Sequence, residues 1–295
     1  MLLAVALAVV AIRPSLLLDR LPGGDASVSA PSPLPAETAL PSSAPGDTAQ
    51  AGLPTLDEPF RGSPARAWAE GADAIELPAA KAVGDMSKAE VALALRLTKE
   101  FLVAGNLDPA VLRGGQPTEA MALLDPKQPG MLADARRSLR SPDREHDPVN
   151  LFSRFDPDEV QPAGDVVKVR GHMTFEAGKP GQVRVHADYT FVYPLVRAEG
   201  GDEQVERTIV QRDLTVLLSD PGRWQVTEGR LQVEGYVGEY YNVECEVHDG
   251  YLHPSFPTTG PTGAPPAGPA IDPYDRSRSV SKTPGEAECG KVTRT

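Results

Sequence analysis

The chain has 295 residues, including 30 prolines and 27 glycines, and a formal net charge of −12 at pH 7. This acidic balance argues against nucleic-acid binding, which needs a basic face toward the phosphates. The chain also offers no polybasic segment for an anionic membrane surface. Proline is concentrated in the two flanks, so we expect one folded domain between two arms that do not fold.

The N-terminal flank begins with an apolar run, Met1–Ile12, which resumes at Leu16–Leu18 after a short break. A helix that spans a bilayer needs about 20 apolar residues. The run reaches this length only if both parts are counted or if further residues precede them. We expect residues 1–20 to be an uncleaved membrane anchor. A cleaved signal peptide is the alternative, although no basic segment precedes the run.

Two opposing signals bear on the orientation of this anchor. Arg13 and Arg20 follow the apolar run, and the positive-inside rule would place that side in the cytoplasm. The two cysteines and the long spacer favour an extracytoplasmic body instead, and we expect that arrangement. The spacer, residues 21–84, is rich in Pro, Ala, Ser and Gly, so we expect an extended linker. Trp68 is expected to be a lone aromatic residue in it, or else to pack on the domain.

The two cysteines are Cys245, just after the last predicted strands, and Cys289, near the C-terminus. An even count in an exported chain allows one disulfide, which would tie the Pro- and Gly-rich arm of residues 257–295 to the sheet. Two unrelated thiols are the alternative. Neither cysteine belongs to a CxxC pair, so we expect no metal site on them.

The folded domain is expected over residues 85–256, and its first element is a helix. Ser87 and Glu90 match a capping box at the helix start. Apolar residues then recur at helical spacing as far as Gly105, which suits a C-terminal stop. These residues are Val91, Ala94, Leu95, Phe101 and Leu102, widened by Leu93 and Leu97. We therefore expect a largely buried helix.

Short helical pieces follow, and then a polar stretch with many carboxylates between Asp143 and Glu159. Clustered carboxylates can hold calcium, but their spacing matches no calcium loop, so we expect a solvated acidic loop. His248, Asp249 and His253 offer two imidazoles and a carboxylate near the end of the domain. They lack the spacing of a helical zinc motif, and we expect them to be surface loop residues.

Four strands with a period of two are predicted after the acidic loop. The first two, Val166–Phe175 and Val183–Leu195, are expected to form a hairpin through the turn Gly178–Gly181. The other two are expected to form a second hairpin within Thr208–Tyr236, joined by a tight turn at Ser219–Gly222.

The second hairpin contains a change of phase. Trp224 and Val226 occupy even positions, whereas Leu231 and Val233 occupy odd ones. We predict a β-bulge at Glu228-Gly229, because an extra residue there would return the apolar side chains to one face. A bulge would also bend the sheet over the helix.

One side of the first hairpin carries a row of polar side chains. Lys168, Arg170 and His172 share that side of the first strand, and Arg184, His186 and Asp188 share it on the second. His186 and Asp188, with His172 beside them, are candidates for general acid–base catalysis. The three cationic residues are candidates for ligand binding. The alternative is a solvated or partner-facing surface with cross-strand ion pairs.

Motifs of common catalytic sites are missing from the sequence. There is no G-x-S-x-G, no phosphate-binding P-loop, no G-x-G-x-x-G and no HExxH. Neither cysteine has the surroundings of a nucleophile. We therefore expect no cofactor and no metal, and a protein that binds rather than catalyses.

The order of elements resembles the NTF2-like superfamily, the cystatin-like alpha-plus-beta cones. The resemblance rests on Ser87–Gly105, Val166–Phe175, Val183–Leu195 and Thr208–Val237, which includes GRWQVTEGRLQVEGY. It implies an α+β fold, in which an N-terminal helix and short helices pack on a curved antiparallel sheet of about four to six strands. Members of this superfamily include enzymes, ligand carriers and protein-binding modules, so the resemblance leaves the function open.

The whole chain also looks like exported, membrane-anchored proteins of high-GC Gram-positive bacteria, on its anchor, its spacer and the stretch from DGYLHPSFP to ECGKVTRT. We expect a non-enzymatic binding module that contacts a cell-envelope protein or a small ligand. One alternative is a carrier or enzyme with a polar pocket on the sheet. Another is a structural component of an envelope assembly. A closed pocket lined by His172, His186 and Asp188 would favour the carrier or enzyme.

Overall fold

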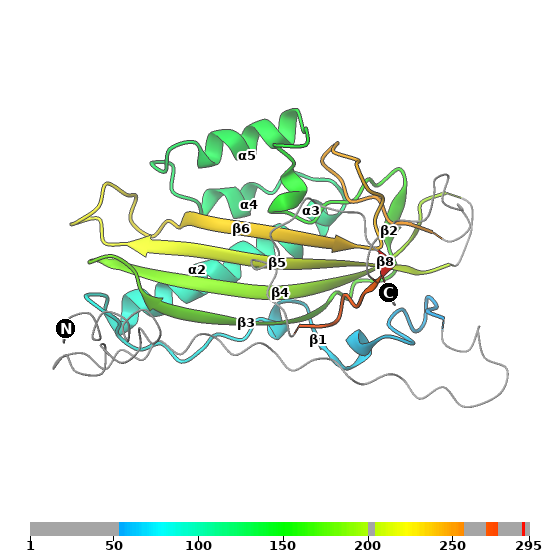
Figure 1. Ribbon diagram of the computed structural model, residues 1–295, viewed down its shortest axis with the longest axis horizontal. Helices are drawn as coiled ribbons and strands as arrows, with labels where there is room; N and C mark the ends of the chain where they lie inside the picture. Colours follow the sequence, from blue (N-terminus) through cyan, green and yellow to red (C-terminus); the bar gives the residue numbers. More distant parts are fainter. Residues whose placement is uncertain (1–52, 200–203, 257–269, 277–290, 293–295) are drawn as a thin grey trace, which may run out of the picture. The chain divides into compact units, whose positions relative to one another are not determined.

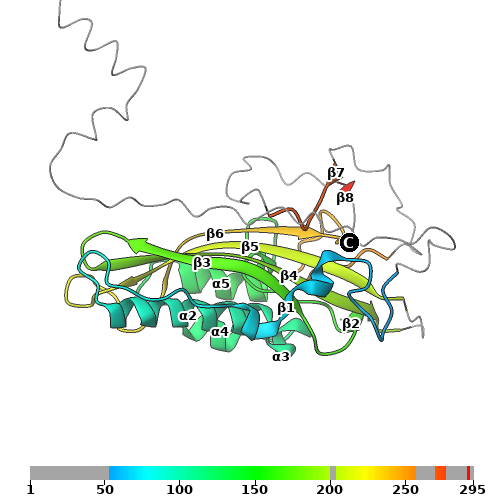
Figure 2. The same cartoon turned by 90° about the horizontal axis from the view of Figure 1, so that it is seen from below.

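The computed structural model describes residues 53–199, 204–256, 270–276 and 291–292. Its central element is an antiparallel sheet of six strands in the order β1-β3-β4-β5-β6, with β2 also paired to β4. The helices lie along one side of this sheet (Figures 1 and 2). The architecture is therefore α+β. We call the side of the sheet that faces the helices the inner face, and the opposite side the outer face.

Along the chain the helices come before the long strands. The sheet contains β1 (Ala69–Glu70), β2 (Val160–Pro162), β3 (Lys168–Ala177), β4 (Gln182–Arg197), β5 (Glu206–Ser219) and β6 (Gln232–Tyr241). The helices are α2 (Lys88–Asn106), α3 (Pro109–Leu112), α4 (Thr118–Ala122) and α5 (Met131–Arg140). Three 3-10 helices are η3 (Pro64–Ala67), η4 (Gly71–Ala74) and η5 (Pro148–Asn150). A separate parallel pair joins β7 (Ala270–Ile271) to β8 (Lys291–Val292).

The first predicted hairpin is confirmed. Strands β3 and β4 pair antiparallel, from Lys168 opposite Val192 to Ala177 opposite Val183. The turn closes where the amide of Gly178 donates to the carbonyl of Gln182 at 3.0 Å. Odd-numbered residues of β4 point to the inner face because successive side chains alternate. They are buried there in the main core.

The second hairpin differs from its prediction. Its first strand, β5, ends at Ser219, but its second strand begins only at Gln232. Between them Trp224 Nε1 donates to the carbonyl of Pro180 at 2.9 Å, and the amide of Thr227 donates to Asp125 Oδ1 at 3.2 Å. The predicted strand around Trp224 is wrong because these contacts hold the segment to neighbouring loops rather than to β5.

A bulge is present, but at a different residue. Thr215 pairs with Gly235 and Val216 with Val233, so Glu234 is the extra residue. The predicted position at Glu228-Gly229 is wrong, since that pair lies in the loop before β6. The phase change in the sequence therefore marks the passage from loop to strand.

Helix α2 covers the inner face. Ser87 caps it, since its amide donates to Glu90 Oε2 at 2.7 Å and its Oγ accepts from the amide of Glu90 at 3.3 Å. The loss of such a cap costs about 1 kcal/mol. The buried stripe of α2 packs in the main core, where Val91, Leu95 and Phe101 are at most 1% exposed. Burying each large apolar side chain contributes about 1.5–3 kcal/mol.

A second, smaller core lies on the outer face. Val192 of β4 and Ile209 of β5 are cross-strand partners and fully buried there. Phe60, Ala65 and Trp68, from the segment before the expected domain, pack with them, and so does Tyr274 from the segment after it. The outer face is therefore an occupied surface rather than a bare one.

This second core places parts of both predicted arms within the packed body. Trp68 is 6% exposed, so it is not a lone aromatic residue in a linker but packs on the domain, which was the alternative. Packing begins before the expected domain start at residue 85, and it includes Tyr274 of the expected C-terminal arm. The physical reason is that the apolar patch of Val192 and Ile209 gains stability when other residues remove it from water.

Two further predictions concern residues outside the described ranges. The first is the predicted anchor, residues 1–20. In the described part of the chain, no helix combines the length and apolar character required to cross a bilayer. Cys245 follows β6, whereas Cys289 lies outside the described residues, so their disulfide stays a prediction.

Candidate functional site

The predicted acid–base residues lie together on the outer face. His172 of β3 is directly opposite Asp188 of β4, and Asp188 is directly opposite Asp213 of β5. His186 lies two residues before Asp188 and points to the same face. These residues therefore do not line a pocket between helix and sheet. Together with Arg276 we call them the outer-face cluster.

The ionic partners within this cluster differ from the predicted His186–Asp188 pair. His186 Nε2 lies 2.8 Å from Asp213 Oδ1, whereas Asp188 pairs with the guanidinium of Arg276. The Arg276 side chain is 1% exposed and that of Asp188 is 8% exposed. The cluster thus holds two buried carboxylates, one beside an imidazole and one paired with a guanidinium.

Asp213 and Arg276 were not among the predicted site residues. The sequence pattern could have indicated Asp213, because it is a polar residue at an odd-numbered position of β5, and the register of β4 and β5 places it opposite Asp188. No pattern points to Arg276, because it follows a proline-rich stretch without periodicity.

The two histidines of the cluster differ in their electrostatic surroundings. The hydrogen bond to Asp213 raises the pKa of His186 above its ordinary value, against the opposing effect of burial. Burial lowers the pKa of His172. Neither ring nitrogen of His172 has a hydrogen-bond partner among the residues that the structure describes. His186 is therefore the imidazole that holds a proton more readily than an ordinary histidine, and His172 holds one less readily.

The three predicted ligand-binding residues hold the fold together. Lys168 Nζ donates to the carbonyl of Trp68 at 3.0 Å and to Glu70 Oε1 at 2.9 Å, which fastens β1 to β3. The Arg170 guanidinium lies 5.9 Å from the centre of the Trp68 ring.

Arg184 has a similar role farther along the outer face. It donates to Glu234 Oε1 at 2.8 Å and to Glu176 Oε1 at 3.0 Å, so it links β6, β4 and β3. These two carboxylates raise the pKa of Arg184, with Glu234 as the larger cause. The guanidinium is therefore a cation shared by two neighbouring carboxylates.

Residues 271–276, which we call the strap, lie across the outer face. Tyr274 is fully buried, and its ring meets the Trp68 ring edge to face, with centroids 5.6 Å apart and an interplanar angle of 75°. Arg276, two residues on, reaches Asp188. One short segment thus contacts both an apolar half and an acidic half of the same face.

Next to the strap, an open groove of about 400 Å³ follows the edge formed by β1 and β3. Trp68, Arg170 and Glu76 supply its larger side chains, and three alanines, Val169 and Gly171 supply the rest.

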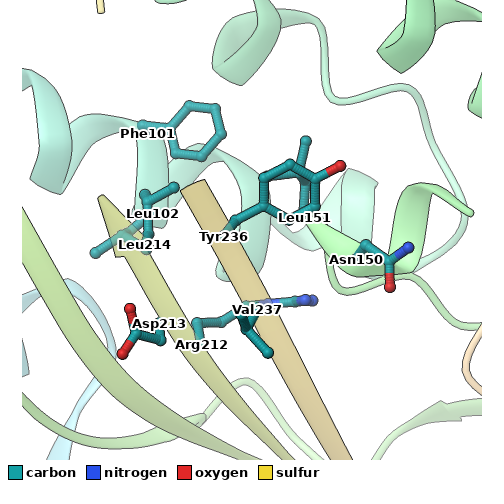
Figure 3. A pocket seen from close by; sticks show the side chains of 9 residues that line it. All are labelled: Phe101, Leu102, Asn150, Leu151, Arg212, Asp213, Leu214, Tyr236 and Val237. Carbon is teal, nitrogen blue, oxygen red and sulfur yellow. The ribbon is translucent and has the colours of Figure 1, made fainter. Parts of the chain in front are cut away.

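A small cavity lies at the inner face of the sheet, beside α2. Its volume is about 10 Å³, and Phe101, Leu102, Leu214 and Tyr236 are among the side chains that line it (Figure 3). A space of this size holds about one water molecule.

Arg212 fills much of the inner face near this cavity. It is 4% exposed and donates to the carbonyl of Val149 at 2.6 Å, to Asn106 Oδ1 at 3.1 Å and to Ser153 Oγ at 3.2 Å. Arg212 occupies an even-numbered position of β5, as the apolar Val210 and Leu214 do, so it interrupts the apolar alternation of this strand. It is the polar centre of a buried network that ties the sheet to the loops beside α2.

The histidines near the end of the domain are not both surface residues. His253 is 9% exposed, with Nδ1 2.7 Å from Glu159 Oε2 and Nε2 3.0 Å from Asp249 Oδ1. The expectation of a surface loop is wrong for His253, because two carboxylates enclose its ring. In the described ranges, no three His, Cys, Asp or Glu side chains are arranged to hold a metal ion.

Comparison of the chain with family models, with curated proteins and with solved structures gave no match.

Proposed function

We propose that the chain is a membrane-anchored extracytoplasmic protein whose folded body is a non-enzymatic binding module. One observation carries this proposal: the outer face of the sheet holds a short, separate segment through a buried aromatic ring and a buried ion pair. A surface that binds an extended segment in this way has the chemistry of a peptide-recognition site. The NTF2-like fold and the extracytoplasmic location belong to the same proposal.

The ion pairs of the outer-face cluster support binding over acid–base catalysis. A general base must be within hydrogen-bond reach of the proton that it removes. His186 is engaged with Asp213, and Asp188 with Arg276. These pairs stabilise the sheet surface and the strap, which is the work of a docking site.

The small inner cavity supports the same choice against a carrier. Pockets for small molecules have volumes of about 300–1,000 Å³. The cavity between α2 and the sheet has about 10 Å³ and Arg212 is part of its lining, so it is too small for a ligand held between helix and sheet. The groove beside Trp68, at about 400 Å³, lies within this range but is open.

A second candidate function, a structural part of an envelope assembly, is favoured by strand β6. It is the last strand of the sheet, and Tyr236 and Val237 are 43% and 41% exposed on it. Edge strands that expose apolar residues are templates for pairing with another chain. Gln128 protects only the start of this edge, since its amide group bonds both the N–H and the C=O of Val233.

Site-specific photocrosslinking in cells tests the proposal and separates the two candidates. A photoreactive residue replaces Ala69 beside the groove, Val237 on the β6 edge, or Arg96 on the far side of α2 as the matched control. We expect an envelope protein to be captured from position 69 and not from 96. Capture of a second copy of the chain from position 237 would instead support the assembly. No adduct above that of position 96 at either site would contradict both.

The location is tested by labelling engineered cysteines in intact cells with a reagent that cannot cross the membrane. We expect a cysteine in place of Ala69 to be labelled without lysis, and the protein to stay in the membrane fraction. Labelling only after lysis would contradict the extracytoplasmic body.

A further inference from the structure

The strap contacts its site as a bound peptide would. Tyr274 is fully buried against Trp68, Val192 and Ile209, which form the apolar half of the site. Arg276 is buried against Asp188, which belongs to the acidic half. Two side chains, separated by one residue, therefore provide the contacts.

The strap brings a cation to the acidic half. Asp188 and Asp213 are 6% and 5% exposed and lie directly opposite each other on β4 and β5. Like charges at opposed positions destabilise a sheet, and a buried charge without a partner is strongly destabilising. His186 contacts Asp213 from within the sheet, and Arg276 of the strap pairs with Asp188.

The strap is distant in sequence from the strands it covers. Residues 257–270 separate it from Phe256 at the end of the domain. The site itself is built from β4, β5 and the segment around Trp68, so its walls come from outside the strap. A segment from another protein with the same two side chains would therefore meet the same contacts.

We propose that this outer-face site recognises an extended peptide segment with the pattern aromatic-X-Arg, and that the strap fills it in cis. The inference rests on the proposed binding function and names the chemistry of its partner. The aromatic ring enters the apolar half beside Trp68, and the guanidinium pairs with Asp188. A tethered segment competes at an effective concentration in the millimolar range, so the free chain holds the site closed to weak ligands.

The test uses the full chain and a fluorescent peptide with the strap sequence AIDPYDRS, Ala270–Ser277. The substitutions Tyr274→Ala and Arg276→Ala together release the strap. Fluorescence anisotropy then measures peptide binding. We expect the released chain to bind the peptide at least tenfold more tightly than the wild-type chain. A peptide with alanine in place of its tyrosine and arginine is expected to bind at least tenfold more weakly.

Substitutions within the site identify the acidic contact. In the released chain, Asp188→Asn is expected to weaken peptide binding at least tenfold. Glu176→Gln is the matched control, because this outer-face carboxylate pairs with Arg184 and not with Arg276. It is expected to change the affinity by less than twofold.

Three results would overturn the inference. The released chain binds the peptide no better than the wild-type chain, Asp188→Asn has no more effect than Glu176→Gln, or the peptide binds equally well without its arginine. If the double variant does not fold, Arg276→Ala alone decides, and no gain in peptide binding over the wild-type chain overturns the proposal. If position 69 captures an envelope partner despite such a result, the binding function remains supported, but the partner does not bind through an aromatic-X-Arg segment.

Discussion

His172 and His186 share one face of the sheet, but their pKa values are shifted in opposite directions. Asp213 accepts a hydrogen bond from His186 and raises its pKa, whereas burial lowers the pKa of His172. The alternation of strand residues predicted that both would lie on the same face. It could not predict their partners, because Asp213 reaches His186 only through the register of β5, and Arg276 comes from a distant segment.

The two histidines are therefore expected to titrate on opposite sides of the ordinary value of 6.5. NMR of the imidazole Cε1–H signals, assigned with His172→Gln and His186→Gln, measures both pKa values. We expect His186 above 6.5 and His172 below it. The reverse order, or both values at 6.5, would contradict the described contacts.

Stability should follow from these shifts. A raised folded-state pKa makes His186 stabilising below pH 6.5, and this contribution disappears as the pH rises through its folded value. The difference in unfolding free energy between wild type and His186→Gln is therefore expected to shrink between pH 6 and 9. The lowered pKa of His172 has the opposite sign, so its burial weakens the fold as the pH falls below 6.5. Urea unfolding across this pH range measures both trends.

Arg212 shows how a residue that breaks a pattern can serve the fold. We expect Arg212→Met to lower the unfolding free energy by about 1–3 kcal/mol, because it leaves buried acceptors at Asn106 and Val149 with fewer donors. Arg96→Met on the exposed side of α2 is the matched control, since its pair with Glu100 is exposed and is worth about 0.5 kcal/mol or less. Equal effects in chemical unfolding would show that the network contributes nothing.

At the scale of elements, strand periodicity located the first hairpin well and the second only in part. The turn Gly178–Gly181 and both of its strands followed from local pattern and turn chemistry. The segment around Trp224 and Val226 alternates like a strand, yet it contacts Pro180 and Asp125 instead of β5. Such non-local hydrogen bonds leave no mark in a local pattern, which is why β6 was predicted to begin too early.

Strand β6 offers a matched pair of glycines for a test of the packing on the inner face. A Cβ on Gly238 would lie 2.6 Å from the Tyr240 hydroxyl and 2.9 Å from Arg212 Nη1, whereas a Cβ on Gly235 would meet nothing within 4 Å. We expect Gly238→Ala to destabilise the domain by about 1–3 kcal/mol, since the buried network must shift. Gly235→Ala should change the stability by less than about 1 kcal/mol. Equal unfolding midpoints in urea would contradict the described network.

At the scale of the whole molecule, the sheet has a core on each face. The inner core was predictable, because α2 and the strands carry long apolar patterns with periods that match their elements. The outer core was not, since the segment around Phe60 and Trp68 and the strap are short and surrounded by proline-rich sequence. Average composition indicates an unfolded arm even where a few apolar residues pack on the domain.

The outer core predicts different roles for the two tryptophans of the chain. Trp68 is 6% exposed between Tyr274 and the sheet, whereas Trp224 is half-buried in a loop. We expect Trp68→Ala to cost about 3 kcal/mol, near the lower end for a buried tryptophan, because only the outer core opens. Trp224→Ala should cost less. Hydrogen exchange is expected to increase in residues 58–70 and 271–276 only for Trp68→Ala.

The proposed outer-face site requires that the strap lies on the outer face, and a single NMR measurement tests this directly. In the full chain, the ring protons of Tyr274 and of the Trp68 indole should show a nuclear Overhauser effect, since their ring centres are 5.6 Å apart. This signal should be lost when Arg276→Ala releases the strap. A chain without such a signal, in which the Trp68 resonances do not change with Arg276→Ala, would contradict both the outer-face site and its peptide chemistry.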